Sequence, residues 1–574
     1  MNRLTYILYF ICISLSLSGC KKSLDLKNAG AFDPASVWND PQLANAYLTN
    51  LYATTLPTGW PVNSGGNADE LSGNLPEDAV TTNNTLFKSW PYDLIRNINI
   101  LLTEIEKGSL PAGTKEKMKG QAYFLRAWVY FNVVKLYGGV PILEQPLGVK
   151  DDLSAGRNST KACFDFIEAD LNKAINALPD QYIGGDRGRI DKAASLAFLG
   201  RVMLYKASPQ FHPSNPYNNT DWPKAYEVNK MAKEQLAGMG FGLNPDYVGI
   251  WAKNNKGNKE AVMSVLFMAP NRMNGRSENQ CRPLSESIDA SGGDQPVWEM
   301  VAAYPMKDGL QPGISLKYPY ELQTFWKDRD PRFYASVVYN GSLYELSRIA
   351  GRRQYTANGV ASIDDVFGGG EQGDFHRTGF FPRKGMDPTL LKSEVTKNET
   401  DWIEIRYAEV LLNFAEAANE TGKSNEALEV LIQIRKRAGI EAGADQLYGL
   451  SGSTGTAQIR NAIYFERRIE FIYEGQRFNE LRRTRRLNEI DGMRKNGLLA
   501  TLKSDKVAED GKTFKLLPED FTYKIQPLFS NGTNLMSTPE RYYFFPIPRV
   551  EIEKNPKLLQ NKGWDGGTFD PTLE

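Results

Sequence analysis

The stretch IEIRYAEVLLNFAEAANETGKSNEALEVLIQIRKR, residues 403–437, decides the fold class of this chain. Apolar residues recur at helical spacing on both sides of a short polar break, Glu420 to Ser424, which contains Gly422. Such a break between two amphipathic segments predicts a pair of antiparallel helices, over Ile403–Asn419 and Asn425–Arg437.

Small residues in this pair follow the spacing of a known helical repeat. Ala415, Gly422 and Ala427 match the small positions of a tetratricopeptide repeat, a helix pair of about 34 residues. Leu431 and Ile434 take the two apolar positions of its second helix, although the closing proline is missing from the sequence. We therefore expect a diverged tetratricopeptide-like scaffold. An unrelated set of antiparallel helix hairpins would pack by similar physics and remains the alternative.

Two further helix pairs are predicted upstream, after a first helix over Pro41–Ala53. One pair joins Lys119–Tyr137 to Lys161–Leu178, and the other joins Asp191–Ala207 to Asp221–Ala237. The Lys119–Tyr137 segment is apolar on nearly every face, which predicts burial on most sides. The chain is therefore expected to be mostly α-helical.

Other segments interrupt this helical pattern. Residues Thr54–Lys88 are rich in Gly, Asn, Thr and Pro and predict an exposed loop. The region 261–400 is loop-rich and aromatic-rich, with short β-like runs at Ala261–Met268 and Ala335–Tyr339. A last long helix is predicted over Ala457–Arg486. We divide the chain into a leader at 1–19, an N-terminal part at 20–260, the region 261–400 as the expected ligand-binding part, and a C-terminal part at 401–574.

Three charged motifs are interpreted as structural. The run Glu466–Glu470 is expected to form ion pairs within and between helices, because charges four positions apart share a helix face. Arg329–Arg332 is expected to fix a turn or helix start, and the arginines of Arg482–Arg486 a solvated helix end.

Composition excludes several classes of protein. The chain of 574 residues has 68 basic and 68 acidic residues, so it lacks the basic excess of a nucleic-acid-binding protein. Its two histidines, His212 and His376, argue against a His-based metal site and against a Ser-His or Cys-His catalytic system. We expect no catalytic residue, no cofactor and no metal.

The N-terminal sequence predicts a lipid anchor. Arg3 precedes an apolar run, Leu4–Leu17, that is shorter than the roughly 20 residues needed to cross a bilayer. The run ends in Leu17-Ser18-Gly19-Cys20, a lipobox in which the thiol of Cys20 takes the lipid. Cys163 and Cys281 remain in the body, either paired or as buried free thiols.

Motifs across almost the whole chain resemble the SusD/RagB family. They are Leu24-Asp25 after the lipobox, WPYDLIRNIN at 90–99, RAWVYF at 126–131 with YGGVP at 137–141, MKDG at 306–309 with RDPRF at 329–333, IRYAEVLL at 405–412, ERRIEF at 466–471 with GQRF at 475–478, and FPIP at 545–548 before NP at 555–556. The resemblance implies a surface-exposed, lipid-anchored protein of the outer membrane in Bacteroidota. Such proteins capture a glycan, or sometimes a peptide, and cap a SusC-like TonB-dependent transporter.

A glycan site needs flat aromatic faces and planar polar groups on loops held by a rigid scaffold. By that test the candidate ligand-binding residues are Trp60, Asp69, Trp90, Arg276, Trp298, Tyr304, Tyr318, Tyr320 and Trp326. Trp60, between Gly59 and Pro61, is expected to be exposed, whereas any of these aromatics can instead serve to pack a loop onto the body. Two other functions remain open: a tetratricopeptide-type adapter that binds peptides, and a surface glycoside hydrolase.

Overall fold

The computed structural model describes most of the chain after the N-terminal segment. The described residues are 34–61, 64–77, 79–83, 89–148, 150–251, 257–274, 278–288, 292–357, 360, 364, 378–507, 513–528 and 535–574. Cys20, Arg276 and His376 lie outside them, so the predictions made for these residues stay predictions.

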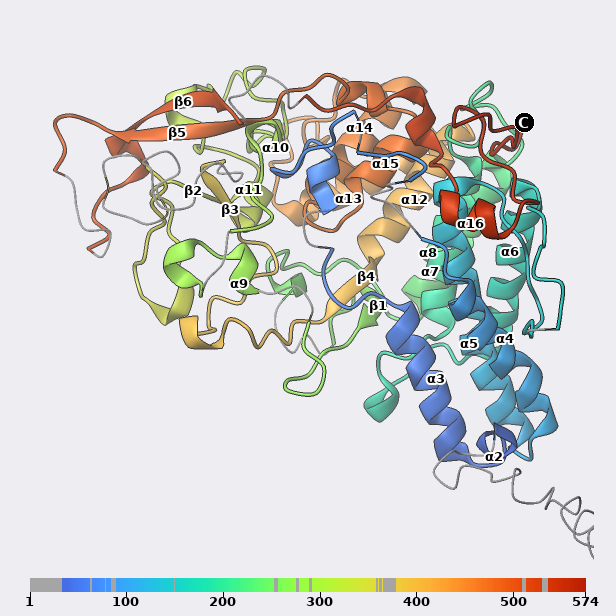
Figure 1. Cartoon of the computed structure of the whole chain (residues 1–574). Coiled ribbons are helices and arrows are strands. Elements are labelled where there is room, and N and C mark those ends of the chain that lie inside the picture. Colours follow the sequence, from blue (N-terminus) through green and yellow to red (C-terminus); the bar gives the residue numbers. More distant parts are fainter. Residues whose placement is uncertain are drawn as a thin grey trace, which may run out of the picture.

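A stack of helices forms the scaffold and confirms the expected mostly helical fold. Its long helices are α3 (Pro41–Thr55), α4 (Tyr92–Glu104), α5 (Ala112–Tyr137), α6 (Thr160–Ala177), α7 (Lys192–Ala207), α8 (Trp222–Gly238), α12 (Tyr407–Glu420), α13 (Ser424–Ala438) and α14 (Thr456–Glu470). The three predicted pairs are present, because α5 packs on α6, α7 on α8 and α12 on α13. Helix α12 also contacts α7, α8 and α14, which joins the pairs into one repeat-like stack (Figure 1).

Local signals in the sequence explain where these helices begin and approach one another. Asp191 caps α7 by accepting a hydrogen bond from the backbone N–H of Ala194 at 2.9 Å. Gly200 lets α8 come close, since a Cβ at this position would lie 2.5 Å from Oδ1 of Asn229. The Nδ2 of Asn229 donates to the Gly200 carbonyl at 3.1 Å, so a polar bond fills the space that the missing side chain leaves.

The start of the third pair differs from the prediction. Residues Trp402–Arg406 form strand β4, and α12 begins only at Tyr407. Strand β4 pairs antiparallel with β1 (Ala261–Val265). The helical pattern read from Ile403 was wrong because Ile403 and Ile405 alternate with Glu404 and Arg406, which is the period of a strand.

The last long helix is also interrupted. Helix α14 ends at Glu470, and α15 (Arg477–Arg483) starts after a turn. Tyr473 and Gly475 both have positive φ in this turn, at 65° and 71°. A right-handed α-helix requires negative φ, so the helix cannot pass through these residues. The continuous helix predicted over Ala457–Arg486 was therefore wrong.

The irregular part carries small sheets and short helices. Strand β2 (Val337–Tyr339) pairs with β3 (Phe380–Pro382), and β5 (Asn496–Leu502) pairs with β6 (Phe521–Pro527), both antiparallel. The short helices are α2 (Pro34–Val37), α9 (Glu278–Cys281), α10 (Trp298–Ala303), α11 (Pro331–Ser336) and α16 (Arg549–Lys554). In Figure 1 the β5–β6 hairpin and the loops around α9 lie at the end of the molecule opposite the α3–α6 helices.

A buried ion-pair network joins the scaffold to this irregular part. Arg406 of β4 contacts Glu470 and Glu474 at 2.7 and 2.9 Å, and Arg332 of α11 contacts Glu466 and Glu470 at 2.6 and 2.8 Å. These side chains are all at most 3% exposed. The ion pairs expected around Glu466–Glu470 are thus confirmed.

The helix start predicted at Arg329–Arg332 is confirmed as well. Asp330 is the N-cap of α11, and its carboxylate accepts a hydrogen bond from the backbone N–H of Arg332 at 2.9 Å. The same carboxylate contacts the Arg332 guanidinium at 2.8 Å, so one aspartate both starts the helix and joins the ion-pair network.

The arginines of Arg482–Arg486, at the end of α15, were expected at a solvated helix end, and for two of them this was wrong. Arg483 is fully buried and forms a two-pronged ion pair with Glu416 at 2.6 and 2.7 Å. Arg482 is 1% exposed and donates to the carbonyls of Tyr542 and Tyr543 at 3.0 and 2.8 Å. Their burial follows from long-range packing against α12 and the C-terminal segment, which no local pattern reveals.

The segment Thr54–Lys88 is not simply an exposed loop, because many of its described residues are buried. Leu71 and Leu75 are at most 2% exposed. The ammonium group of Lys495 donates to the carbonyls of Gly66 and Leu71 at 2.6 and 2.8 Å, which fixes the segment against the body.

Two remaining expectations concern cysteines and membranes. Cys163 and Cys281 are both buried, and they are not joined in a disulfide, so the paired alternative fails. Within the described residues, no helix is both long and apolar enough for a membrane span.

Candidate functional site

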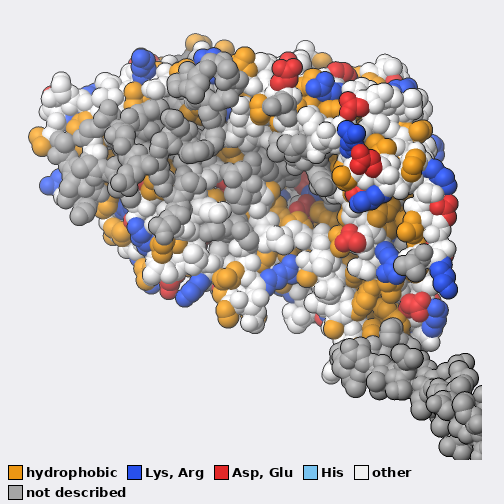
Figure 2. Space-filling view, in the orientation of Figure 1, with side chains coloured by type: hydrophobic (Ala, Val, Ile, Leu, Met, Phe, Trp, Pro, Cys, Tyr) orange, Lys and Arg blue, Asp and Glu red, His pale blue; other side chains and the backbone are white. Residues whose placement is uncertain are grey.

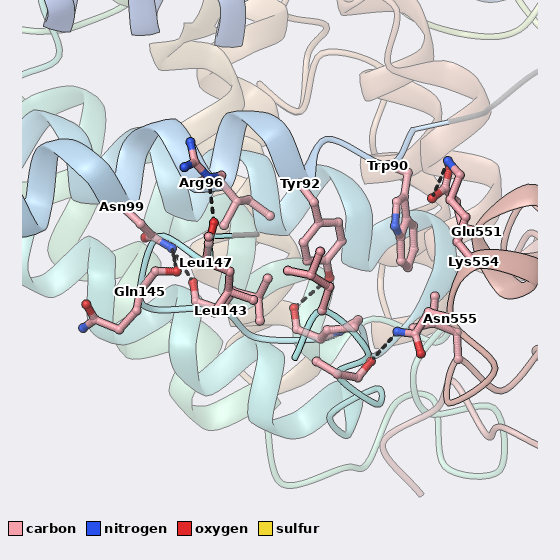
Figure 3. Close-up of a pocket in the computed structure, with 16 residues that line it drawn as sticks. Trp90, Tyr92, Arg96, Asn99, Leu143, Gln145, Leu147, Glu551, Lys554 and Asn555 are labelled. Atoms are coloured by element: carbon pink, nitrogen blue, oxygen red, sulfur yellow. Dashed lines mark hydrogen bonds and ion pairs between the residues drawn. The ribbon is translucent and has the colours of Figure 1, made fainter. Parts of the chain in front are cut away.

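An apolar groove of about 550 Å³ lies between the start of α4, the loop 141–155 and α16. Figure 3 shows its side chains entering from these three segments. We refer to it as the α4 groove. Its lining residues are Trp90, Tyr92, Ile95, Arg96, Asn99, Pro141, Leu143, Gln145, Leu147, Gly148, Leu153, Ala155, Glu551, Lys554, Asn555 and Leu558.

Helical spacing places the α4 side chains on one wall. Tyr92, Arg96 and Asn99 are separated by four and three positions and therefore share a face of the helix. Each holds the facing loop through a backbone carbonyl: Oη of Tyr92 donates to Pro141 at 2.7 Å, Nε of Arg96 to Leu147 at 2.7 Å, and Nδ2 of Asn99 to Leu143 at 2.8 Å (Figure 3). The loop is thus fixed to a rigid helix, as a preformed site requires.

Two aromatic rings form one end of the groove. The ring centroids of Trp90 and Tyr92 are 5.0 Å apart, and Trp90 also contacts Tyr137 at 5.9 Å. Trp90 and Tyr92 are half-buried, so each packs on the body and still presents ring surface. Burial raises the pKa of Tyr92 well above its usual value, which keeps the phenol neutral.

Polar groups lie at both ends of the groove, with Glu551, Lys554 and Asn555 beside Trp90 and Gln145 at the far end (Figure 3). Glu551 and Lys554 of α16 form an ion pair at 3.3 Å, and Nδ2 of Asn555 donates to the carbonyl of Ala155 at 2.8 Å (Figure 3). Gln145 is exposed and adds a second amide. Rings, amides and charged groups around an apolar floor suit a ligand with both flat apolar faces and hydroxyl groups.

Among those candidate residues from the sequence that the structure describes, Trp90 is the one that lines the α4 groove. Trp60 was expected to be exposed, and this was wrong, because it is only 5% exposed. Its ring lies 4.4 Å from Trp251 and 5.1 Å from Trp402, centroid to centroid. A Cβ on Gly385 would fall 2.2 Å from the Trp60 ring, so this glycine is needed to admit the indole.

Asp69 is also buried and serves as an ion-pair partner. Its carboxylate lies 2.8 Å from Arg477 and 3.0 Å from Arg468. Although burial opposes ionisation, the two guanidinium groups hold the pKa of Asp69 well below its usual range. The geometry therefore assigns Asp69 a place inside the body.

The candidates from the middle region fall into two groups. Trp298, Tyr304 and Trp326 are at most 8% exposed and belong to an aromatic cluster around Phe325, in which the Trp298 and Trp326 rings lie 5.6 and 5.3 Å from the Phe325 ring. Tyr318 and Tyr320 are partly exposed. The Tyr318 hydroxyl donates to Glu441 at 2.6 Å, and Tyr320 lies under the guanidinium of Arg329 at 5.4 Å.

The structure does not bring the predicted residues into one site. Apart from Trp90, the α4 groove is lined by residues that the sequence did not single out as ligands. The spacing of Tyr92, Arg96 and Asn99 was a signal that could have found the α4 wall. Nothing local could have found Glu551 and Lys554, because they lie more than 400 positions away in the chain.

A second cavity, of about 650 Å³, lies between the segments 246–251 and 383–389. Lys384 lines this cavity, and its ammonium group donates to Glu474 at 2.6 Å and to the Glu470 carbonyl at 2.9 Å. Trp251 also lines the cavity, and its indole ring packs against Trp60. Trp251 and Lys384 are at most 5% exposed, whereas Trp90 and Tyr92 still present ring surface and Gln145 is exposed, so the α4 groove is the better candidate for an external ligand.

Two family models match the chain. The model described as the SusD family matches residues 259–564, which is more than half of the chain. A model described as starch-binding and associating with the outer membrane matches residues 44–204.

Curated relatives and solved structures agree with these matches. SusD-like protein P2 of Formosa agariphila is 24% identical and covers 97% of this chain and 99% of its own. The crystal structure of a SusD-like protein from Bacteroides fragilis is 26% identical, with a TM-score of 0.73 over 93% of this chain and 99% of its own. A structure named as a laminarin-binding SusD-like protein is similar in fold, with 21% identity, a TM-score of 0.60 and coverage of 92% of this chain and 100% of its own.

Proposed function

The chain belongs to the SusD family, and from this premise we propose that it is a cell-surface lipoprotein that captures oligosaccharides in the α4 groove. It then delivers them to a SusC-like TonB-dependent transporter of the outer membrane. The observation that carries the proposal is the Trp90–Tyr92 pair at the end of a preformed groove of about 550 Å³. That volume lies in the range of small-molecule binding sites.

Names of related structures support a glycan as the ligand class. One relative of the same fold is named as laminarin-binding, and another, from Bacteroides uniformis, as surface glycan-binding protein A, with 19% identity and a TM-score of 0.59 over 91% of this chain and 99% of its own. In the α4 groove, the apolar face of a sugar ring would stack on Trp90 and the amide of Asn555 would meet its hydroxyl groups, while Gln145 at the other end of the groove would meet a second sugar unit (Figure 3).

The charges of the groove favour binding without hydrolysis. Glycoside hydrolases act with two carboxyl groups about 5–10 Å apart. Among the described lining residues, Glu551 alone carries a carboxylate, and it is paired with Lys554. We therefore propose a binding protein and expect intact oligosaccharide after incubation.

The test is a binding screen by isothermal titration with laminarin-derived and starch-derived oligosaccharides. Trp90→Ala should weaken binding by about tenfold, since losing about 1.4 kcal/mol of ring contact has that effect. Tyr318→Ala is the matched control, because it removes a partly exposed ring outside the groove. A normal affinity in Trp90→Ala with a weakened Tyr318→Ala would move the site to the middle region.

The same samples distinguish the other functions. Release of shorter sugars would indicate a hydrolase, and binding of peptides but not sugars would indicate an adapter that uses the helix pairs. The transporter partner is tested separately, by purifying the lipoprotein from the outer membrane in mild detergent. A large β-barrel protein should co-purify, and recovery of the lipoprotein alone would contradict delivery to a transporter.

A further inference from the structure

A smaller cavity of about 210 Å³ lies where α5, α7, β4 and the turn before α15 meet. We call it the junction cavity. Figure 2 shows a hollow near the middle of the drawn face, bordered by charged side chains, in the region where Figure 1 places β4 and α15. It is separate from the α4 groove and shares none of its described lining residues.

Aromatic rings and amides line the junction cavity. Trp128 of α5 and Trp402 of β4 are 7% and 3% exposed. Asn132, Gln476 and Asn479 supply amide groups. Aromatic side chains together with planar amides suit a sugar ring, and the volume of the cavity limits the ligand to about one ring, since sites for larger ligands start at about 300 Å³.

The carboxylates of the cavity are already bonded. Arg201 donates to Glu409 at 2.6 and 2.8 Å and to Glu404 at 2.8 Å. The indole N–H of Trp402 donates to the other oxygen of Glu404 at 2.8 Å. The two remaining carboxylates are paired as well: Glu474 contacts Lys384 and Arg406, Glu480 contacts Arg467 and Arg483.

Lys135 is the exception among the charged groups. Its ammonium lies 5.7 Å from the Phe131 ring, and no carboxylate among the described residues forms an ion pair with it. Burial, together with Arg201 and Arg482, lowers the pKa of Lys135 to about 8, with Glu404 acting in the opposite direction. A partly buried ammonium without a counter-ion is stabilised by an anion that enters the cavity.

We propose that the junction cavity binds one hexuronic acid unit, with its carboxylate on Lys135 and its ring among the indoles and amides that line the cavity. A neutral sugar would fill the space and leave Lys135 without a counter-ion. A small anion would satisfy Lys135 and fill only part of the cavity of about 210 Å³. A uronic acid satisfies both, either as a free monosaccharide or as the end of an acidic oligosaccharide.

Titration calorimetry on the purified protein tests this with D-glucuronate, D-glucose and acetate. We expect glucuronate to bind at least about tenfold more tightly than either, the effect of one hydrogen bond to a charged group. Equal binding of glucose, equal binding of acetate, or no binding of glucuronate would overturn the proposal. A disaccharide with glucuronate at its non-reducing end is the second arm, and it distinguishes a chain end from the free acid.

Lys135→Met should remove the preference for glucuronate over glucose. Lys117→Met is the matched control, since Lys117 is an exposed lysine on the same helix, and it should keep the preference. If Lys135→Met fails to fold, the pH dependence of glucuronate binding to the wild-type protein still tests the role of Lys135. Its affinity for glucuronate should fall as the pH rises above about 8, where Lys135 loses its proton, and an affinity that is constant up to pH 10 would contradict the role of Lys135.

The proposals for the junction cavity and for the α4 groove can be tested independently of each other. Trp90→Ala should leave glucuronate binding unchanged, and Lys135→Met should leave binding of neutral oligosaccharides unchanged. Loss of glucuronate binding in Trp90→Ala would mean that the acid binds in the α4 groove, which would overturn the assignment to the junction cavity.

Discussion

Arg406 and Glu470 form a fully buried ion pair, with Nη1 of the arginine 2.7 Å from Oε1 of the glutamate. Arg406 ends the β4 strand and Glu470 ends the α14 helix, so the pair fixes the small β1–β4 sheet to the helical stack. The same arginine contacts Glu260 at 2.7 Å and Glu474 at 2.9 Å. One guanidinium thus contacts three buried carboxylates, and Arg332, Arg437 and Lys384 supply the other positive charges of this network.

Arg406→Met should lower the free energy of unfolding by about 3–5 kcal/mol, because it removes one positive charge from a buried network and leaves its carboxylates with an uncompensated negative charge. Urea denaturation followed by circular dichroism measures the change. The control is Arg549→Met, which removes an exposed pair with Glu553 and should change stability by less than about 0.5 kcal/mol. Similar losses in both variants would show that burial does not set the strength of the Arg406 network.

Glu70 should make stability depend on pH. It is 1% exposed, and burial together with the neighbouring Asp69 raises its pKa to about 8. Between about pH 4.5 and 8 the unfolded chain therefore ionises this group while the folded protein keeps its proton. The folded state then binds more protons, so the free energy of unfolding decreases as the pH rises, by up to about 1.4 kcal/mol per pH unit.

Glu70→Gln removes this contribution without changing the shape of the side chain. Its stability relative to the wild type should grow from pH 4.5 to pH 8, as measured by urea denaturation at a series of pH values. Glu77→Gln, which alters an exposed carboxylate of the same segment, should follow the wild-type profile. A constant difference between Glu70→Gln and the wild type across this range would show that Glu70 is ionised when folded.

Sequence patterns predicted the scaffold well because helix pairs are specified locally. The break at Gly422 and the apolar faces around it predicted α12 and α13 from neighbouring residues alone. The same reasoning failed at Ile403, where a strand period of two precedes the helix, and at Tyr473, whose positive φ ends α14. Both errors lie at element boundaries, where a few residues decide between two patterns.

The candidate site was harder to predict because loop aromatics have the same appearance in sequence whether they bind a ligand or pack. Trp60 and Trp90 both lie beside proline in Gly- or Asn-rich surroundings, yet Trp60 is enclosed by two other tryptophans and Trp90 lines a groove. The difference comes from Trp251 and Trp402, which are distant in sequence. Burial of this kind depends on long-range contacts and was not available from the local pattern.

Cys20→Ala tests the lipid anchor predicted from the lipobox. The variant should lack the acyl chains and leave the outer-membrane fraction, since the thiol is the attachment point. Cell fractionation with mass spectrometry of the N-terminal peptide measures both effects. Cys163→Ala, at a buried free thiol of the body, is the control and should remain membrane-bound. Unchanged fractionation of Cys20→Ala would contradict the anchor.

Trp60→Ala should lower the stability of the protein without changing its affinity for oligosaccharides. Removing an indole that packs on Trp251 and Trp402 leaves a cavity, and such changes cost about 3–5 kcal/mol. The melting temperature should fall, while folded molecules keep their affinity for oligosaccharides, in contrast to Trp90→Ala. Calorimetric melting and titration of the same preparation separate the two effects. The Trp60 ring also lies against Gly385. A lost affinity for oligosaccharides with an unchanged melting temperature would contradict this prediction, since it would mean that the indole contacts a ligand and that its packing does not stabilise the fold.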